Sequence, residues 1–326
     1  MKKYFIFTSL LLILFSCRKD EINQIDGPNL FDIYGDFSII SGLTVSQPNV
    51  DFSAGENVFF SCELTKIVDW EITITGQTSG AQKIISGTSK ILNQENSTWF
   101  GSTTNLPMFK AELCDVMLTF SGEADTLYTT VTVDQQKTNL GFVVADFETG
   151  WNSGWSTFIQ SGGNMDFSIK ADSNSPEKDN YYNVQGTVNW DWLIGLVDFN
   201  ASAYGASVLP LTDNGDNLYF NALVYGEAGL PNTLGLFRFD EDDNNDGSFN
   251  ELTEDQFTYE FPVDWVGWKL ISIKYTDLVG NGNGGNVYNP NKINKVSFLH
   301  LANPSSGFAK SGLDYLIFTE NEPLIP

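Results

Sequence analysis

A strict alternation of apolar and polar residues restricts the possible folds of this chain more than any other feature. In the segment 70–75, one tryptophan and two isoleucines alternate with a glutamate and two threonines. The same period of two recurs in residues 58–64, 114–120 and 127–133. Successive side chains of a β-strand point to opposite faces, so each segment is predicted to be a strand with one buried face. Glycines in turn positions separate these segments, and the sequence therefore predicts an all-β fold.

The length and composition of the chain suit two β-sandwich domains. A chain of 326 residues, of which 41% are hydrophobic, can bury one or two sizeable cores. A polar stretch at 135–139 is predicted to be a linker, with a first sandwich over 30–134 and a second over 140–326. The second region contains further apolar segments of strand length at 143–148, 218–225, 234–239, 257–263, 268–275, 296–301 and 312–318.

The first 29 residues have the pattern of a leader and a tether. Two lysines precede an apolar run over residues 4–15, which is too short for a membrane span and fits a secretory leader. The run ends in Leu-Phe-Ser-Cys at 14–17, which resembles the lipobox of bacterial lipoproteins. That resemblance implies a signal peptide over 1–16, lipidation of Cys17 and a lipidated tether over 17–29. The alternative is an ordinary signal peptide followed by an incidental cysteine.

Charge and the residues after Cys17 bear on location and partners. Lys-Asp-Glu at 19–21 resembles the export signal of Bacteroidetes-type surface lipoproteins, which implies a lipid-anchored protein exposed on the outer membrane. The chain has 41 Asp and Glu against 17 Lys and Arg, so nucleic acid is excluded as a partner. The same acidic balance disfavours anionic lipid headgroups, so we expect membrane attachment by the lipid anchor only.

The remaining cysteines, Cys62 and Cys114, both fall on the apolar faces of predicted strands. If two sheets pack face to face, the two thiols can meet across the core and form a disulfide in an oxidising compartment. With Trp70 nearby, this arrangement resembles an immunoglobulin-like sandwich. The alternative is a pair of reduced cysteines that pack as small apolar side chains.

The second domain resembles the galactose-binding-like, jelly-roll carbohydrate-binding modules. The resemblance rests on the opening strand at 143–148, a tryptophan-containing strand at 268–273 and a closing strand that contains Asp314. It implies that exposed aromatic rings bind sugars by stacking. The candidate glycan-binding residues are Trp151, Trp155, Trp190 and Trp192. The alternative role for these rings is packing in the core.

Two groups of acidic residues are candidate Ca²⁺ sites. Glu148 and Asp314 lie on the first and last strands of the second domain, which such sandwiches pair. In a separate loop, Asp242, Asn244 and Asp246 match the opening of a calcium loop, where alternate oxygens face the ion. The alternatives are surface or capping acids for the first group and a solvated, charged loop for the second.

Signatures of enzymes are sparse. His300 is the one histidine of the chain and lies in an apolar strand pattern, which predicts a packed or surface strand residue. Nucleophilic triads are therefore disfavoured, although a pair of carboxylates for glycoside hydrolysis stays open. We expect a non-catalytic protein that binds polysaccharide or oligosaccharide, with the layout of accessory lipoproteins in outer-membrane transporter complexes for glycan uptake. The alternative is a structural or adhesion lipoprotein that binds another protein.

Overall fold

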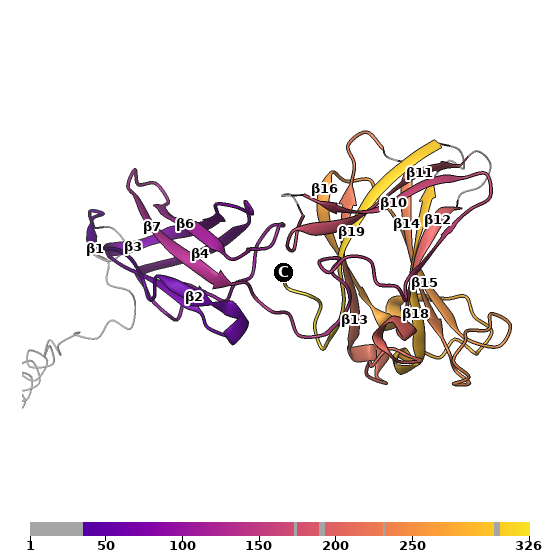
Figure 1. Cartoon of the computed structure of the whole chain (residues 1–326). Coiled ribbons are helices and arrows are strands. Elements are labelled where there is room, and N and C mark those ends of the chain that lie inside the picture. The colour runs from indigo at the N-terminus through magenta and orange to yellow at the C-terminus, as the bar shows by residue number, and fades with distance from the viewer. Residues whose placement is uncertain (1–34, 173–174, 189–192, 231, 303–306) are drawn as a thin grey trace, which may run out of the picture.

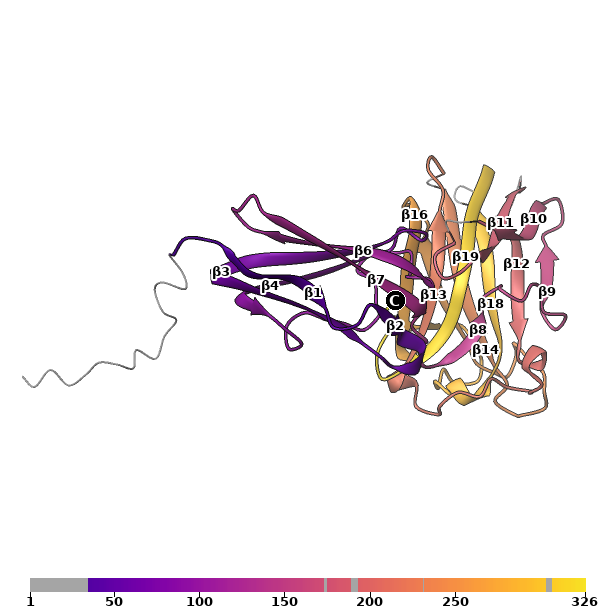
Figure 2. The ribbon, with the colours of Figure 1, turned by 60° about the vertical axis from the view of Figure 1, so that its left-hand side comes forward.

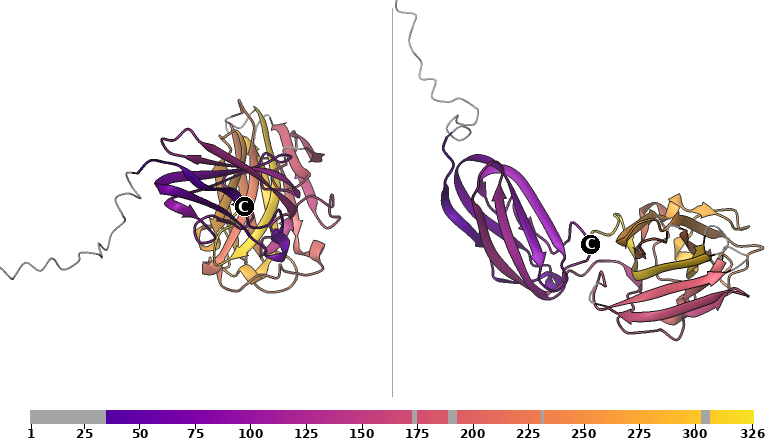
Figure 3. Two further views of the ribbon diagram at one scale, coloured as in Figure 1. Left: turned by 90° about the vertical axis from the view of Figure 1, so that its left-hand side faces the viewer. Right: turned by 90° about the horizontal axis from the view of Figure 1, so that it is seen from above.

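The structure is a computed structural model that describes residues 35–326 apart from 173–174, 189–192, 231 and 303–306. These residues form two β-rich domains that lie side by side, with the end of the chain between them (Figures 1 and 3). Strands and short 3₁₀ helices make up the secondary structure, which confirms the all-β prediction. No described helix is long and apolar enough to span a membrane. The predicted leader, Cys17 and the tether at 17–29 lie outside the described residues.

The N-terminal domain consists of one seven-stranded sheet in the order β1-β3-β6-β7-β2, with β4 and β5 also paired to β3. Its strands run lengthwise toward the second domain (Figure 2). A short 3₁₀ helix, η1, covers Phe52–Ala54. The strands are β1 (Ile39–Val45), β2 (Asn49–Asp51), β3 (Val58–Gly76), β4 (Gln82–Leu92), β5 (Thr98–Trp99), β6 (Glu112–Phe120) and β7 (Thr126–Gln135).

Strand β3 organises this domain because it is long enough to pair with different partners at its two ends. Its first part pairs with β1 and β5, and its last part pairs with β6. Buried and exposed residues alternate along most of it, as the period of two predicts. The buried residues form one core, whose members lie between Val50 and Val133 in the sequence and include Phe60, Ile72 and Trp99. The immunoglobulin-like assignment of this domain stays a prediction.

The predicted disulfide between Cys62 and Cys114 is wrong, because both cysteines are buried and free. The register pairs Cys114 with Gly76 at the end of β3, whereas Cys62 lies near the start of the same strand. At about 3.3 Å per strand residue, most of the length of β3 separates the two thiols. A disulfide requires Cα atoms within about 7 Å. Burial raises the pKa of Cys62 and raises that of Cys114 to about 12, so both stay protonated as small apolar side chains.

The C-terminal domain is a sandwich of two six-stranded sheets. The first sheet has the order β10-β11-β19-β13-β16, with β8 paired to β19, and the second has the order β17-β15-β14-β18-β12-β9. Short 3₁₀ helices connect some strands: η2 (Ala201–Tyr204), η3 (Gly215–Asn217), η4 (Tyr275–Asp277) and η5 (Pro290–Lys292). The strands are β8 (Phe142–Ala145), β9 (Ser156–Ile159), β10 (Asn164–Ala171), β11 (Asn180–Val188), β12 (Leu193–Asn200), β13 (Leu218–Gly226), β14 (Thr233–Glu241), β15 (Gln256–Pro262), β16 (Gly267–Lys274), β17 (Val279–Gly280), β18 (Ile293–Ala302) and β19 (Gly307–Glu320).

An aromatic core fills the space between these two sheets. Phe220 of the first sheet meets Phe237 and Phe239 of the second sheet at centroid distances of 4.9 and 5.0 Å. Edge-to-face packing of this kind stabilises the core beyond the area that it buries. The first and last strands of the domain pair, since β8 lies antiparallel to β19. The sandwich architecture expected from the sequence is therefore present.

The two domains contact each other at a second place besides the connecting segment. The Met108 N–H donates to the Pro176 carbonyl at 2.7 Å, and the Thr103 N–H donates to the Pro326 carbonyl at 2.7 Å. Met108 also packs into an apolar cluster with Tyr315 and other residues on the outer face of the first sheet. Part of that outer face is thus covered by the N-terminal domain.

Candidate functional site

The structure separates the tryptophans that the sequence grouped as a sugar-binding surface. Trp155 is only 8% exposed, belongs to the core and donates from Nε1 to the Tyr204 hydroxyl at 3.2 Å. Trp151 is 43% exposed, and its ring meets that of Trp155 nearly at a right angle. The pair therefore forms no continuous flat surface. Trp190 and Trp192 lie outside the described residues.

Three other aromatic side chains converge on the outer face of the first sheet. We call Tyr181 of β11, Tyr225 of β13 and Trp268 of β16 the aromatic platform. The ring of Trp268 lies 5.4 Å from that of Tyr181 and 5.3 Å from that of Tyr225. All three side chains are partly exposed. They point away from the core, because their strand neighbours Tyr182, Val224 and others point into it.

Gly312 of β19 makes this convergence possible. It pairs with Tyr225 across the sheet, and a Cβ atom at this position would lie 3.0 to 3.2 Å from side-chain atoms of all three platform residues. Any larger residue would push the rings apart. The sequence pattern did not reveal the platform, because its members come from three strands that only the sheet order brings together.

Polar and charged groups border the aromatic platform. Lys310 and Glu227 form an ion pair beside it, and the hydrogen bond to Glu227 is the main reason why the pKa of Lys310 is raised. The pKa of Tyr181 is raised first by burial and then by the charge of Asp172, while Lys310 opposes the rise. Flat rings beside hydroxyl, ammonium and carboxylate groups are a surface suited to a ligand with both C–H faces and hydroxyls.

Of the first predicted Ca²⁺ pair, Asp314 lies on β19 of the same sheet, whereas Glu148 lies in the turn after β8, because that strand ends at Ala145. Asp314 is fully buried, and its carboxylate accepts hydrogen bonds from the Ser175 hydroxyl at 3.1 Å and the Tyr315 N–H at 2.8 Å. Burial, the charge of Glu177 and, less strongly, that of Glu148 raise its pKa well above the usual range. Glu148 itself accepts two backbone N–H bonds through Oε1. Calcium between Glu148 and Asp314 stays a prediction.

The second predicted Ca²⁺ set shapes its own loop. The carboxylate of Asp242 accepts the N–H groups of Asp246 at 3.0 Å and of Gly247 at 2.8 Å. The Asn244 side-chain oxygen also accepts the Asp246 N–H, at 2.7 Å, and Asp246 accepts the Ser248 N–H. These oxygens form the turns that close the loop. Calcium on Asp242, Asn244 and Asp246 stays a prediction.

The neighbouring acids in this region form a different cluster. Oxygen atoms of Glu241, Asp243 and Asp255 lie within 4.8 Å of one another, and we call these residues the carboxylate cluster. Glu241 and Asp255 are buried, at 0% and 1% exposed. Burial, followed by the charges of Asp243 and Asp255, raises the pKa of Glu241 to about 8. The calcium-loop pattern selected Asp242, Asn244 and Asp246, whereas the carboxylate cluster takes the neighbouring Glu241 and Asp243 and adds Asp255.

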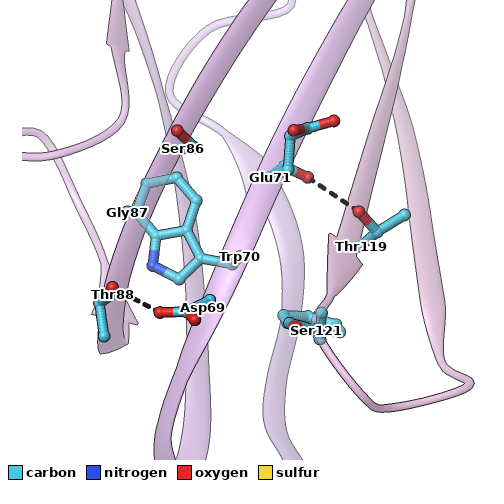
Figure 4. A pocket seen from close by; sticks show the side chains of 9 residues that line it. Asp69, Trp70, Glu71, Ser86, Gly87, Thr88, Thr119 and Ser121 are labelled. Carbon is cyan, nitrogen blue, oxygen red and sulfur yellow. Dashed lines mark hydrogen bonds between the residues drawn. The ribbon is translucent and has the colours of Figure 1, made fainter.

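A further hollow of about 450 Å³ lies on the N-terminal domain (Figure 4). It is lined by acids and hydroxyls, among them Asp69, which accepts a hydrogen bond from the Thr88 hydroxyl at 2.6 Å. The ring of Trp70 lies beneath Gly87 and is 2% exposed. This hollow thus offers carboxylates and hydroxyls but no exposed tryptophan face.

His300 is a packed strand residue, as predicted. It is fully buried, and its Nδ1 lies 3.2 Å from the Ser311 hydroxyl oxygen. Burial lowers its pKa from 6.5 to about 4. A neutral imidazole between two sheets has no access to a substrate, so it supports no acid–base chemistry at a surface.

Comparisons with known proteins found solved structures of low similarity to this chain. No family model and no curated protein sequence matches it. Among solved structures, a family 11 carbohydrate-binding module from Clostridium thermocellum, in complex with a β-1,3-1,4-mixed-linked tetrasaccharide, is 17% identical with a TM-score of 0.40. That match covers 56% of this chain and 98% of the other.

A second solved structure extends over more of the chain. SGBP-B from a complex xyloglucan utilization locus in Bacteroides uniformis is 12% identical with a TM-score of 0.34. The match covers 87% of this chain and 73% of the other. At such low similarity, function has to be inferred from the residues of the chain itself.

Proposed function

We propose that this protein is a non-catalytic glycan-binding lipoprotein of the outer-membrane surface. The observation that carries the proposal is the aromatic platform, in which three rings from separate strands converge above Gly312 on an outward face. Rigid sheet strands hold these rings in place before any ligand arrives, which lowers the entropic cost of binding.

The chemistry of the aromatic platform suits a sugar. The C–H face of a pyranose ring packs against the flat face of an indole or phenol ring, and the bordering Lys310, Glu227 and Tyr181 hydroxyl can bind its hydroxyl groups. An oligosaccharide offers several such rings in a row, and Tyr181, Trp268 and Tyr225 span three strands. We therefore assign polysaccharides or oligosaccharides as the ligand class.

The non-catalytic assignment rests on two titratable side chains that are not free to act on a substrate. His300 is buried, and Glu227 next to the aromatic platform is engaged by Lys310. Location at the cell surface, anchoring through Cys17 and association with an outer-membrane transporter complex rest on the leader sequence and belong to the proposal.

A glycan array followed by affinity electrophoresis tests the proposal. We expect the protein to bind at least one soluble polysaccharide without releasing reducing ends. Trp268→Ala should weaken that binding by about tenfold or more, which corresponds to about 1.4 kcal/mol. Tyr128→Ala is the matched control, because Tyr128 is 71% exposed on the other domain.

The outcomes separate the remaining assignments. Binding that is lost in Trp151→Ala but kept in Trp268→Ala would move the site to the turn predicted from the sequence. Release of reducing ends would overturn the non-catalytic assignment. No binding to any glycan would favour the structural or adhesion role.

A further inference from the structure

We propose that the carboxylate cluster of Glu241, Asp243 and Asp255 binds one Ca²⁺ ion. The site lies where the end of β14 meets the loop before β15 and the glycine-rich segment after β17. This inference does not depend on glycan binding, and it concerns residues other than those that the calcium-loop pattern selects.

The first argument is geometric. Oxygen atoms of the three side chains lie within 4.8 Å of one another. A Ca²⁺ ion binds oxygen at about 2.3 to 2.6 Å, so two ligands on opposite sides of it are about 5 Å apart. Three oxygens within this spacing can therefore share one ion with little movement. Because all the donors are oxygen atoms, the site suits a hard cation rather than a transition metal.

The second argument is an unpartnered buried oxygen. Glu241 is 0% exposed, and its Oε1 accepts hydrogen bonds from the Tyr275 hydroxyl and from the Asn289 N–H, both at 2.8 Å. Its Oε2 has no hydrogen-bond partner. A buried carboxylate oxygen without a partner is costly, and a bound cation removes that cost.

Charge balance points in the same direction. Within the part of the chain that the structure describes, no lysine or arginine forms an ion pair with Glu241, Asp243 or Asp255. The nearby Lys295 and Arg238 instead pair with Asp240. Three adjacent carboxylates repel one another unless a positive charge lies between them.

The surrounding backbone is already arranged around the carboxylate cluster. Asp255 accepts the N–H groups of Asn286 and Val287, both at 2.9 Å, and Asp243 accepts the N–H of Asp255 at 2.9 Å. A Cβ atom at Gly284 would lie 2.8 Å from Asp243 Oδ2, so only glycine allows this close approach. The ion would thus join the loop at 242–255 to the segment at 281–289.

Calorimetric titration of the chelator-treated full chain with CaCl₂ tests the proposal. We expect the wild type to bind one Ca²⁺ ion and to show a Ca²⁺-dependent rise in melting temperature. The Asp243→Asn variant should lose both the binding and the rise. The matched control is Asp246→Asn, which removes an exposed carboxylate of the same loop. It should keep the affinity within about threefold, because its oxygens hold the turn rather than the ion.

Glu241→Gln gives a second, independent measurement. A glutamine keeps an oxygen for Tyr275 and Asn289 and replaces the unpartnered oxygen with a neutral group. We expect a higher melting temperature than wild type in chelator and no further rise with Ca²⁺.

Three outcomes would overturn the proposal. They are the absence of binding heat and of any Ca²⁺-dependent melting shift in the wild type, unchanged binding in both Asp243→Asn and Glu241→Gln, and loss of binding in Asp246→Asn alone. The last outcome would move the ion to the residues of the calcium-loop pattern.

Discussion

Glu112 and Glu241 are buried glutamates of different domains, and their carboxylates are satisfied in different ways. Glu112 of the N-terminal domain is 6% exposed, and its Oε2 accepts the N–H groups of Thr78 and Ser79 at 2.7 and 2.9 Å. Its Oε1 accepts the Ser79 hydroxyl and the Lys110 N–H. Glu241 of the C-terminal domain is equally buried, but two other carboxylates adjoin it and one of its oxygens has no partner.

The comparison shows that the hydrogen-bond donors around a buried carboxylate indicate its role. Four donors around Glu112 supply the stabilisation that water would give, so this carboxylate holds the turn between β3 and β4 together. Glu241 lacks that full set of donors, and its environment is complete only with a cation. The same substitution at the two positions should therefore have opposite effects.

His300 extends the comparison to a base and gives the largest expected effect. Its folded pKa of about 4 lies below the unfolded value of 6.5, so the unfolded chain binds the proton more readily between these values. Stability should be complete above about pH 6.5 and fall by roughly 3 kcal/mol as the pH decreases to 4. Urea unfolding of wild type and His300→Gln at several pH values measures this. Identical pH profiles would contradict the assignment of a neutral buried imidazole.

Glu112→Gln should destabilise the N-terminal domain by about 2 kcal/mol. The new amide NH₂ group would face backbone N–H groups that now donate to the carboxylate. Those N–H groups would lose their acceptor, and two donors would repel each other. Urea unfolding followed by tryptophan fluorescence measures the loss. Glu63→Gln, an exposed position on β3, is the control and should leave the midpoint unchanged. A stable Glu112→Gln protein would remove the contrast between the two glutamates.

Glu241→Gln should have the opposite sign and the smallest effect. In the presence of chelator we expect a gain of about 1 kcal/mol, because a neutral amide avoids the cost of burying the Glu241 carboxyl beside two other carboxylates. In excess Ca²⁺ the order should reverse, since only the wild type gains the free energy of binding. A variant that is less stable than wild type in chelator would show that the carboxylate is already satisfied.

Much of the architecture could be predicted from the sequence, because the period of two acts locally. Segments such as 58–64 and 114–120 are strands with the predicted buried faces. The disulfide between Cys62 and Cys114 failed because the face of a residue does not reveal its position along a paired strand. Only the register, which places Cys114 opposite Gly76, shows that the two thiols are far apart.

The candidate sites were harder to predict for a similar reason. Trp151 and Trp155 share a turn but not an environment, while Tyr181, Tyr225 and Trp268 are distant in sequence and adjacent in the sheet. In the acidic run, the pattern of alternating oxygens selected the residues that close the loop. The carboxylate cluster needs Asp255 from the far side of that loop, which spacing alone does not indicate.

Affinity electrophoresis in gels that contain the best polysaccharide from a glycan array tests the central claim most directly. Wild type, Trp268→Ala, Tyr225→Ala and the control Tyr128→Ala should be run side by side. The account predicts retardation of wild type and control and near-normal migration of both platform variants. Equal retardation of all four proteins, or none in any polysaccharide, would contradict glycan binding at the aromatic platform.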